Sequence, residues 1–219
     1  KLKQNYYPMY LNNSKIIVIK IGSSLLINNE KKIRNKWLFE FSRDIKNLLN
    51  KNKKIIIVSS GAIAMGCKKL NLSKKNLKLE KSQAVASVGQ IELMNLFNKN
   101  FLKNKINISQ ILLTLEDTEQ RRRALNAKRT FENLFELGFV PIVNENDSTA
   151  TTEIKYGDND RLASRVAQIS GADVLVLLSD VDGLYTSNPK LNKNVELIKE
   201  IKNIDKNIEN IATKSIGEH

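Results

Sequence analysis

Cysteine and histidine are almost absent from this 219-residue sequence, in which Cys67 is the only cysteine and His219 the only histidine. A single cysteine excludes an internal disulfide, and one residue of each kind cannot build a Cys/His zinc site. Catalysis by a Ser-His-Asp or Cys-His arrangement is excluded for the same reason. Any reaction must therefore proceed without imidazole chemistry.

Long apolar runs are also missing. None approaches the roughly 20 residues that cross a bilayer, and residues 1–14 lack the apolar core of a secretion signal. We therefore expect a cytoplasmic protein with no membrane partner. No Pro/Ser-rich linker, repeat or low-complexity boundary divides the chain, so we expect residues 1–14 as an N-terminal extension and residues 15–219 as one domain.

Positive charge is plentiful, with 36 Lys and Arg against 23 Asp and Glu and a formal net charge of +13. Such a balance suits a nucleic-acid-binding protein or an anionic small substrate. The lysines are scattered among asparagines along the whole chain, and the one dense cluster, Arg121–Arg123 with Lys128 and Arg129, lies on an expected helix. A solvated helix face explains that cluster, so the pattern argues against nucleic acid.

Short β-branched runs alternate with amphipathic segments along the chain. Strands are expected at residues 15–21, 54–58, 108–115, 139–143 and 173–178. Helices are expected at residues 34–50, 79–101 and 116–137 and from about residue 159. This alternation predicts an α/β fold, a three-layer αβα sandwich with a mostly parallel open sheet.

Small or polar residues follow four of the five expected strands. They are Gly22-Ser23-Ser24, Ser59-Ser60-Gly61, Asn144 to Asp147, and Ser179-Asp180. In open α/β sheets ligands bind beyond the carboxyl ends of the strands, and glycine turns there let a phosphate approach the backbone. Neither GxxxxGK[ST] nor GxGxxG is present, so a P-loop and a dinucleotide fold have no support.

The segment 141–160, PIVNENDSTATTEIKYGDND, carries the densest set of polar side chains. Taken alone, Gly157 with Asp158 or Asn159 is explained as a turn and helix cap. Capping does not readily explain why two acidic, amide-rich clusters, residues 144–147 and 157–160, stand on either side of Lys155. Lys20 stands inside the first expected strand, where it needs an anionic partner, unless that strand is an edge strand from which the lysine reaches solvent.

Seven stretches, taken together and in order, resemble the amino acid kinase family. They are IVIKIGSS, VSSGAIAMG, SVGQIELMNLF, QILLTLED, PIVNEND, EIKYGDND and LLSDVDGLYTSNP. The resemblance covers residues 15–201 and is closest to the branch of the family that acts on L-glutamate. It implies phosphorylation of the side-chain carboxylate of L-glutamate by ATP, the first step of proline biosynthesis, with Mg²⁺ bound mainly through ATP and no metal ligands from the protein.

The resemblance also implies roles for single residues. Lys20 would neutralise the transferred phosphoryl group as a catalytic and nucleotide-binding residue, and Asp160 would hold it in place. The glutamate-binding positions match Ser60, Asp147 and Asn159, with Lys155 approaching the reacting carboxylate. The nucleotide-binding positions match Gly22, Ser179 and Asp180.

Two departures from the family pattern bear on these expectations. The chain begins with Lys1, and it stops at IATKSIGEH, where family members continue with a glycine-rich GTGGM segment and a second phosphate-binding lysine. Many relatives also carry a C-terminal PUA domain, which is not found here. We therefore expect that the C-terminal part of the kinase domain is missing from this chain and that the natural protein is longer.

Alternatives of other classes are a non-catalytic amino-acid-binding regulatory module of the same fold and a nucleic-acid-binding protein. A close variant is the kinase part of a bifunctional synthetase with a fused reductase. The resemblance further implies a homo-oligomer, dimer or tetramer, and proline as a feedback inhibitor.

Overall fold

The computed structural model describes residues 8–28, 32–73, 77–149, 158–187, 192 and 195–214. The chain divides into two compact units, Lys1–Leu178 and Ser179–His219. Among the described residues no helix has both the length and the apolar character that crossing a bilayer requires.

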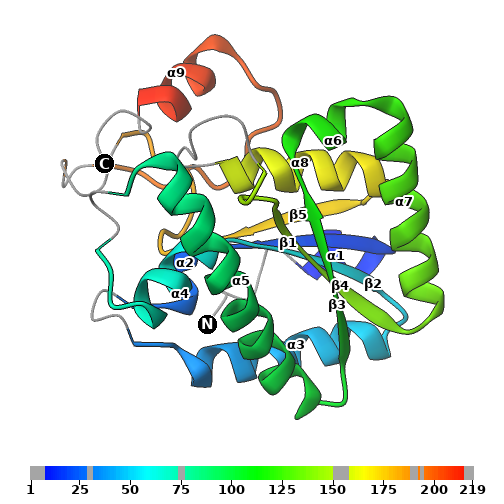
Figure 1. The fold of residues 1–219 in the computed structure, drawn as a ribbon. Helices are drawn as coiled ribbons and strands as arrows, with labels where there is room; N and C mark the ends of the chain where they lie inside the picture. The colour runs from blue at the N-terminus through cyan, green and yellow to red at the C-terminus, as the bar shows by residue number, and fades with distance from the viewer. Residues whose placement is uncertain are drawn as a thin grey trace. The chain divides into compact units, whose positions relative to one another are not determined.

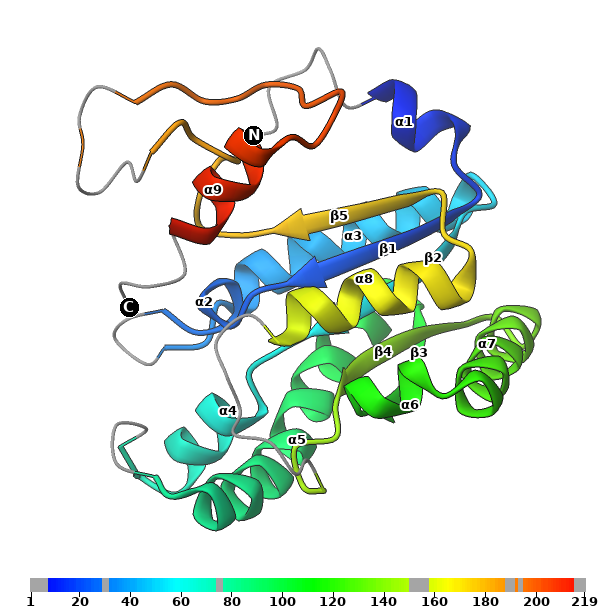
Figure 2. The same ribbon diagram turned by 90° about the horizontal axis from the view of Figure 1, so that it is seen from above.

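Five parallel strands form the centre of the first unit (Figure 1). They are β1 (Ile16–Ile21), β2 (Lys54–Ser59), β3 (Asn107–Leu113), β4 (Phe139–Glu145) and β5 (Val174–Leu178). Their order is β3-β4-β2-β1-β5, and every neighbouring pair is parallel. Figure 2 shows β1 and β5 side by side with their arrowheads pointing the same way. The expected parallel sheet is thus confirmed, with β1 at an inner position.

Helices cover both faces of the sheet. They are α1 (Pro8–Asn13), α2 (Ser23–Leu26), α3 (Asn35–Asn50), α4 (Ala62–Lys69), α5 (Leu79–Leu102), α6 (Leu115–Glu119), α7 (Arg121–Glu136) and α8 (Asp158–Ser170). In Figure 1, α3 and α8 lie on opposite sides of the strands. The expected three-layer αβα architecture is confirmed.

Alternation along the strands assigns each side chain to one of two cores. On β1, Ile17, Ile19 and Ile21 are buried with side chains of α3, α4 and α5. Val18, between them, is buried with Leu162, Ala163 and Val166 of α8 and with side chains of α7. A residue's place in the strand therefore decides whether it faces α5 or α8.

One expected helix is two helices. Residues 116–137 were predicted to be continuous, but α6 ends at Glu119 and α7 begins at Arg121, because Gln120 has extended backbone angles of φ −75° and ψ 114°. The strand expected to reach residue 115 ends at Leu113, since Thr114 caps α6. Thr114 and Asp117 form a capping box, each bonding the other's backbone N–H.

Two glycines let α4 and α5 cross at backbone contact. A Cβ added to Gly66 would stand 2.0 Å from the carbonyl oxygen of Val85, and one added to Gly89 would stand 1.8 Å from that of Ala62. No side chain fits at either position. This crossing fixes the start of α4, just after β2, against the middle of α5.

In the described part of the second unit there are a bridged loop and one helix. Tyr185 and Leu197 form an antiparallel bridge, supported by hydrogen bonds from Thr186 N–H to Glu196 O at 3.0 Å and from Ile198 N–H to Leu184 O at 2.8 Å. The helix α9 spans Lys206–Lys214.

Candidate active site

The carboxyl ends of the five strands meet at one edge of the sheet because all the strands run in one direction. The register aligns Ile21 of β1 with Ser59 of β2 and with Leu178 of β5. On the other side of β2, Val58 pairs with Val143, and Asn144 pairs with Leu112. The polar segments predicted from the sequence to follow β1, β2 and β4 therefore emerge side by side.

Lys20 forms an ion pair with Asp160. Lys20 lies one residue before the end of β1 and, like Val18, faces α8, whose first turn contains Asp160. Lys20 Nζ is 2.7 Å from Asp160 Oδ1, and the side chains are 14% and 50% exposed. The expected anionic partner is confirmed. The alternative of an edge strand is wrong because β1 pairs with β2 on one side and β5 on the other.

Gly22 keeps the space beside this ion pair free of a side chain. A Cβ on Gly22 would lie 3.9 Å from Lys20 Nζ and 3.7 Å from Leu178 O. The Gly22 N–H donates to that same carbonyl of Leu178 at 3.3 Å. The N–H of Gly22 therefore joins the ends of β1 and β5 next to the ammonium group of Lys20.

The turn after β2 lies against the turn after β1. Ser60 N–H and Ser60 Oγ both donate to Ile21 O, each at 3.4 Å. Gly61 has φ +118°, a left-handed value, and a Cβ there would lie 3.6 Å from Ser23 Cβ. A glycine is needed here because L side chains rarely adopt this conformation. Ser60 is thereby held at the expected edge, half-buried.

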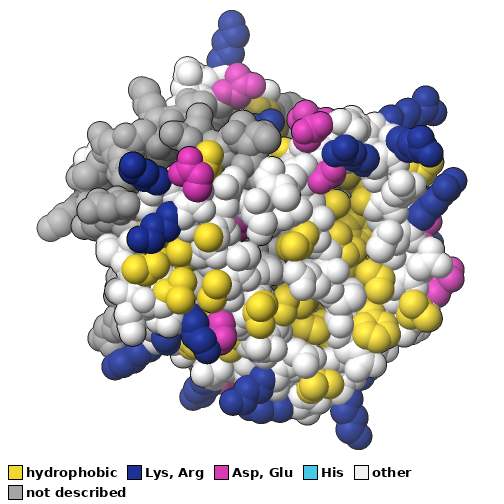
Figure 3. All heavy atoms as spheres, viewed as in Figure 1, with side chains coloured by type: hydrophobic (Ala, Val, Ile, Leu, Met, Phe, Trp, Pro, Cys, Tyr) yellow, Lys and Arg dark blue, Asp and Glu magenta, His cyan; other side chains and the backbone are white. Residues whose placement is uncertain are grey.

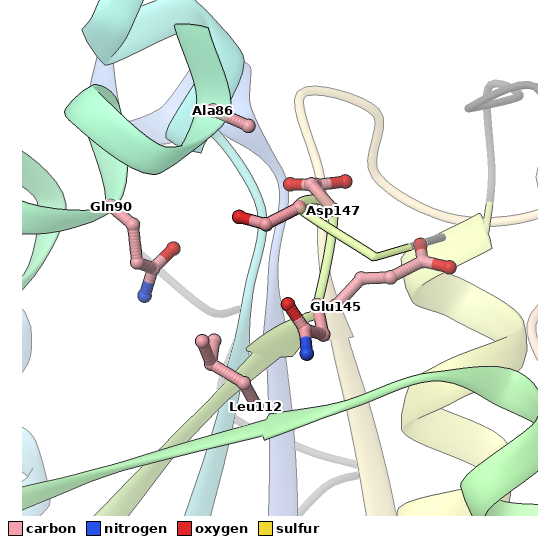
Figure 4. Close-up of a pocket in the computed structure, with 7 residues that line it drawn as sticks. Ala86, Gln90, Leu112, Glu145 and Asp147 are labelled. Atoms are coloured by element: carbon pink, nitrogen blue, oxygen red, sulfur yellow. The ribbon is translucent and has the colours of Figure 1, made fainter. Parts of the chain in front are cut away.

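A pocket opens where β4 ends. It is shallow and open to solvent, and it is lined by Ala86, Gln90, Leu112, Glu145, Asn146, Asp147 and Ser148. Figure 4 shows Gln90 reaching in from α5 on one side, Asp147 on the other and Leu112 between them from β3. The Glu145 carboxylate points away from Gln90, toward α8, as strand alternation requires. Asp147 thus lies at this pocket.

Gln90 is a site residue that the sequence did not single out. Its Oε1 accepts a hydrogen bond of 2.7 Å from Nδ2 of Asn144, which is 1% exposed. SVGQIELMNLF contains this glutamine, but nothing in helical spacing distinguishes a residue that faces a ligand from one that faces the core. Only the pairing of α5 with the end of β4 shows its place.

Of the remaining residues predicted from the sequence, the structure describes Asn159, Ser179 and Asp180 but not Lys155. Asn159 lies next to Asp160 in the first turn of α8, and its buried Oδ1 has no hydrogen-bond partner among the described residues. Lys155 lies outside the described residues. Ser179 and Asp180 belong to the second unit, where Ser179 Oγ donates to Asp180 Oδ1 at 3.2 Å.

Two carboxyl groups outside the Lys20–Asp160 pair and the pocket have lowered pKa values. Hydrogen bonds from the N–H groups of Ile16 and Lys15 hold the pKa of Asp173 below its usual range, at the start of β1. Burial raises the pKa of Asp117, but hydrogen bonds from Thr114 and the neighbouring Arg123 outweigh it and lower the pKa overall. Both groups stabilise the fold.

The arrangement places the Lys20–Asp160 ion pair and the pocket around Asp147 at the same edge of the sheet. In the described part of the chain no group of three or more His, Cys, Asp or Glu side chains lies close enough together to hold a metal ion.

Comparison with known proteins gives matches in sequence. The model of the amino acid kinase family matches residues 15–217. A glutamate 5-kinase of Pelagibacter ubique (strain HTCC1062) is 81% identical over 211 residues, which are 96% of this chain and 57% of that protein. A glutamate 5-kinase of Rhizobium leguminosarum bv. trifolii (strain WSM2304) is 50% identical over 202 residues, covering 92% of this chain and 52% of that protein. The chain spans about half the length of the curated relatives it matches.

Two solved structures share the fold. UMP kinase from Bacillus anthracis matches with a TM-score of 0.58 and 14% identity, over 92% of this chain and 84% of that one. Isopentenyl phosphate kinase from T. acidophilum matches with a TM-score of 0.60 and 18% identity, over 85% of this chain and 79% of that one.

Proposed function

This chain belongs to the amino acid kinase family, and from that premise we propose that it is the kinase part of a glutamate 5-kinase. The reaction transfers the γ-phosphoryl group of ATP to the side-chain carboxylate of L-glutamate and yields L-glutamyl 5-phosphate and ADP. The observation that carries the proposal is the Lys20–Asp160 ion pair at the carboxyl end of β1, beside the open turn at Gly22. The name shared by the curated relatives supports glutamate as the acceptor.

The proposed chemistry needs no general base. A glutamate side chain has a pKa of about 4.3 and is ionised at neutral pH, so its oxygen can attack phosphorus directly. The barrier lies in bringing two anions together and in stabilising charge on the transferred group. Lys20 supplies a positive charge for that purpose, and Asp160 orients the ammonium group before the substrates react.

The other predicted residues have roles around this pair. Asp147 would accept hydrogen bonds from the α-ammonium of glutamate, and Ser60 and Asn159 would contact the same substrate. Lys155 would approach the reacting carboxylate, and Ser179 with Asp180 would contact the nucleotide. Mg²⁺ would arrive with ATP and neutralise its phosphates, and the use of ATP favours a cytoplasmic location.

The experiment that tests the proposal uses the full-length gene product with ATP and Mg²⁺. Acyl phosphate is trapped with hydroxylamine, and L-glutamate is compared with aspartate, N-acetylglutamate, UMP and isopentenyl phosphate. Glutamate-dependent hydroxamate is the expected result. Turnover with another acceptor alone would refute glutamate as the substrate, and no turnover with any of them would favour the regulatory module.

Two expected interactions stay predictions: assembly into a homo-oligomer and inhibition by proline. A homo-oligomer would be detected by light scattering of the full-length protein, and feedback inhibition by a proline-dependent loss of activity that higher glutamate reverses.

A further inference from the structure

The amides of Gln90 and Asn144 form a buried pair between α5 and β4. Asn144 follows Val143 on β4 and, like Ile142, faces the α5 side of the sheet, where Gln90 meets it one residue after the close crossing at Gly89. Asn144 Nδ2 donates to Gln90 Oε1 at 2.7 Å. The pair therefore lies on the opposite face of the sheet from Lys20 but at the same edge.

Half of the hydrogen-bonding capacity of this pair is unused. Gln90 Nε2 and Asn144 Oδ1 are buried and have no hydrogen-bond partner within the described residues. Exchanging the oxygen and nitrogen of both amides does not help, because it again leaves one donor and one acceptor unpaired. Buried polar groups are normally satisfied, so an adjacent donor and acceptor without partners indicate a ligand that brings both.

One of the two unpaired groups belongs to a residue that lines a pocket, Gln90, and Asn144 is bonded to that residue but does not line the pocket itself. Gln90 lines it together with Asp147, and Figure 4 shows the two side chains on opposite sides of the open space. Ala86 and Leu112 add apolar surface to the lining, which Glu145, Asn146 and Ser148 complete. The unpaired donor of Gln90 and the carboxylate of Asp147 at this space, with the unpaired acceptor of Asn144 next to Gln90, complement the α-carboxylate and α-ammonium groups of an amino acid.

We propose that Gln90 is a specificity-determining residue that donates from Nε2 to the α-carboxylate of the acceptor amino acid. By accepting from Asn144 Nδ2, Gln90 also turns Asn144 Oδ1 toward the α-ammonium group. This inference rests on the proposed function, since it concerns the acceptor of that reaction. It gives the enzyme a means of requiring an α-carboxylate, which the phosphoryl transfer itself does not need.

The test compares two ligands that differ only in that group. L-Glutamate is assayed as substrate, and 4-aminobutyrate, which has the same reacting carboxylate and amine but no α-carboxylate, is assayed as competitive inhibitor of the full-length protein. Gln90→Met keeps the length of the side chain but removes both hydrogen bonds. We expect its KM for glutamate to rise roughly ten- to hundredfold, as for a lost hydrogen bond to a charged group, with kcat and the KM for ATP within about twofold.

The inhibition constant of 4-aminobutyrate should change less than threefold in Gln90→Met, because the contact proposed for Gln90 is absent from that ligand. Gln90→Glu keeps an acceptor for Asn144 but puts a negative charge opposite the substrate carboxylate, so it should weaken glutamate binding at least as much as Gln90→Met. Gln83→Met, the same change two turns earlier on the same side of α5 and away from the pocket, is the matched control and should leave the KM unchanged.

Wild-type activity with glutamate separates this inference from the proposed function. If the wild type is active and Gln90→Glu binds glutamate normally, Gln90 is only a brace between α5 and β4 and the inference is wrong. Equal losses of affinity for glutamate and 4-aminobutyrate would also overturn it. If Gln90→Met does not fold, isothermal titration calorimetry of glutamate binding to Gln90→Glu replaces it. Weakened binding supports the inference, and normal binding overturns it. An inactive wild type would overturn both proposals.

Discussion

Lys20 shows how one contact decides between two interpretations of a residue. A lysine inside a strand is tolerated either at an edge or beside a negative charge, and the sequence does not say which strand is an edge. Once β1 has a neighbour on each side, Asp160 is the reason that Lys20 is tolerated there. The two residues are 140 positions apart in the sequence, so their pairing depends on the fold.

Lys20→Ala should reduce kcat about 10²- to 10³-fold, because it removes a charge directed at the transferred phosphoryl group. The melting temperature should change little, since an ion pair with a half-exposed partner contributes little to stability. Steady-state kinetics and thermal unfolding of the full-length protein measure both effects. Lys15→Ala, at the exposed start of the first strand, is the control, and equal losses in the two variants would refute the role given to Lys20.

Asp160→Asn removes only the charge that orients Lys20. We expect kcat to fall about 10- to 100-fold, less than in Lys20→Ala, because the ammonium group remains but is no longer held. In the double variant the two losses should not multiply, since both act through one interaction. A double-mutant cycle on kcat tests this, and full multiplication of the losses would show that the residues act independently.

At the scale of elements, the contact between α4 and α5 depends on having no side chain at the crossing. Gly89→Ala would place a methyl group 1.8 Å from Ala62 O, so we expect a loss of about 3 kcal/mol or more in the free energy of unfolding. Gly138→Ala is the matched control. Its φ of +76° is strained for alanine, but no atom lies within 4 Å, so the loss should be about 1 kcal/mol. Urea unfolding measures both, and similar losses would contradict the tight crossing.

The capping box of α6 should make stability depend on acid. The pKa of Asp117 is lowered in the folded state, so its contribution is complete above its unfolded value of about 3.9 and is lost as the pH falls through the folded value. Asp117→Asn should therefore cost about 0.5–2 kcal/mol at pH 7 and progressively less below about pH 4. Urea unfolding at several pH values measures this. Asp44→Asn, at an exposed position of α3, should show no such trend.

The sequence predicted the elements better than their boundaries. The spacing of apolar residues located all five strands and the helices α3, α5 and α8, because this spacing depends only on neighbouring residues in the sequence. The break at Gln120 was missed, since it contains neither glycine nor proline. The capping box at Thr114 and Asp117, a sequence signal that is weak on its own, marks only the start of α6.

The candidate site was predictable only where a residue follows a strand directly. Lys20, Gly22, Ser60 and Asp147 lie at the expected edge because parallel strands bring their carboxyl ends together. Gln90 was not predictable, because its place depends on the packing of α5 against β4 across 54 residues of sequence. Helical spacing defines a face of α5 but not the part of that face that lies at the end of a neighbouring strand.

At the scale of the whole molecule, the net charge is +13, but on the face shown in Figure 3 the basic side chains do not form one continuous surface. Figure 3 shows Lys and Arg side chains spread around the visible face and interspersed with Asp and Glu. Arg123 of the dense cluster bonds Asp117 at 2.7 Å, and Arg165 bonds Glu119 at 3.2 Å. Local pairing of this kind weakens the field that a nucleic acid would meet.

Binding to DNA should therefore be weak and nonspecific. With the full-length protein and a labelled 20-base-pair duplex at 150 mM KCl, we expect no saturable change in fluorescence anisotropy at about 1 μM protein. Saturable binding below that concentration, with a steep dependence on salt, would support the nucleic-acid-binding class.

The strand order has a consequence for how the chain folds during its synthesis. The inner strand β1 emerges from the ribosome early, but its second neighbour β5 is held to it by Asp173, 157 residues after Ile16. At roughly 5–20 residues per second, β1 waits roughly 8–30 s with one row of backbone groups unpaired. During that interval the nascent chain exposes an aggregation-prone edge, so protection by a chaperone is needed most before residue 178 is translated.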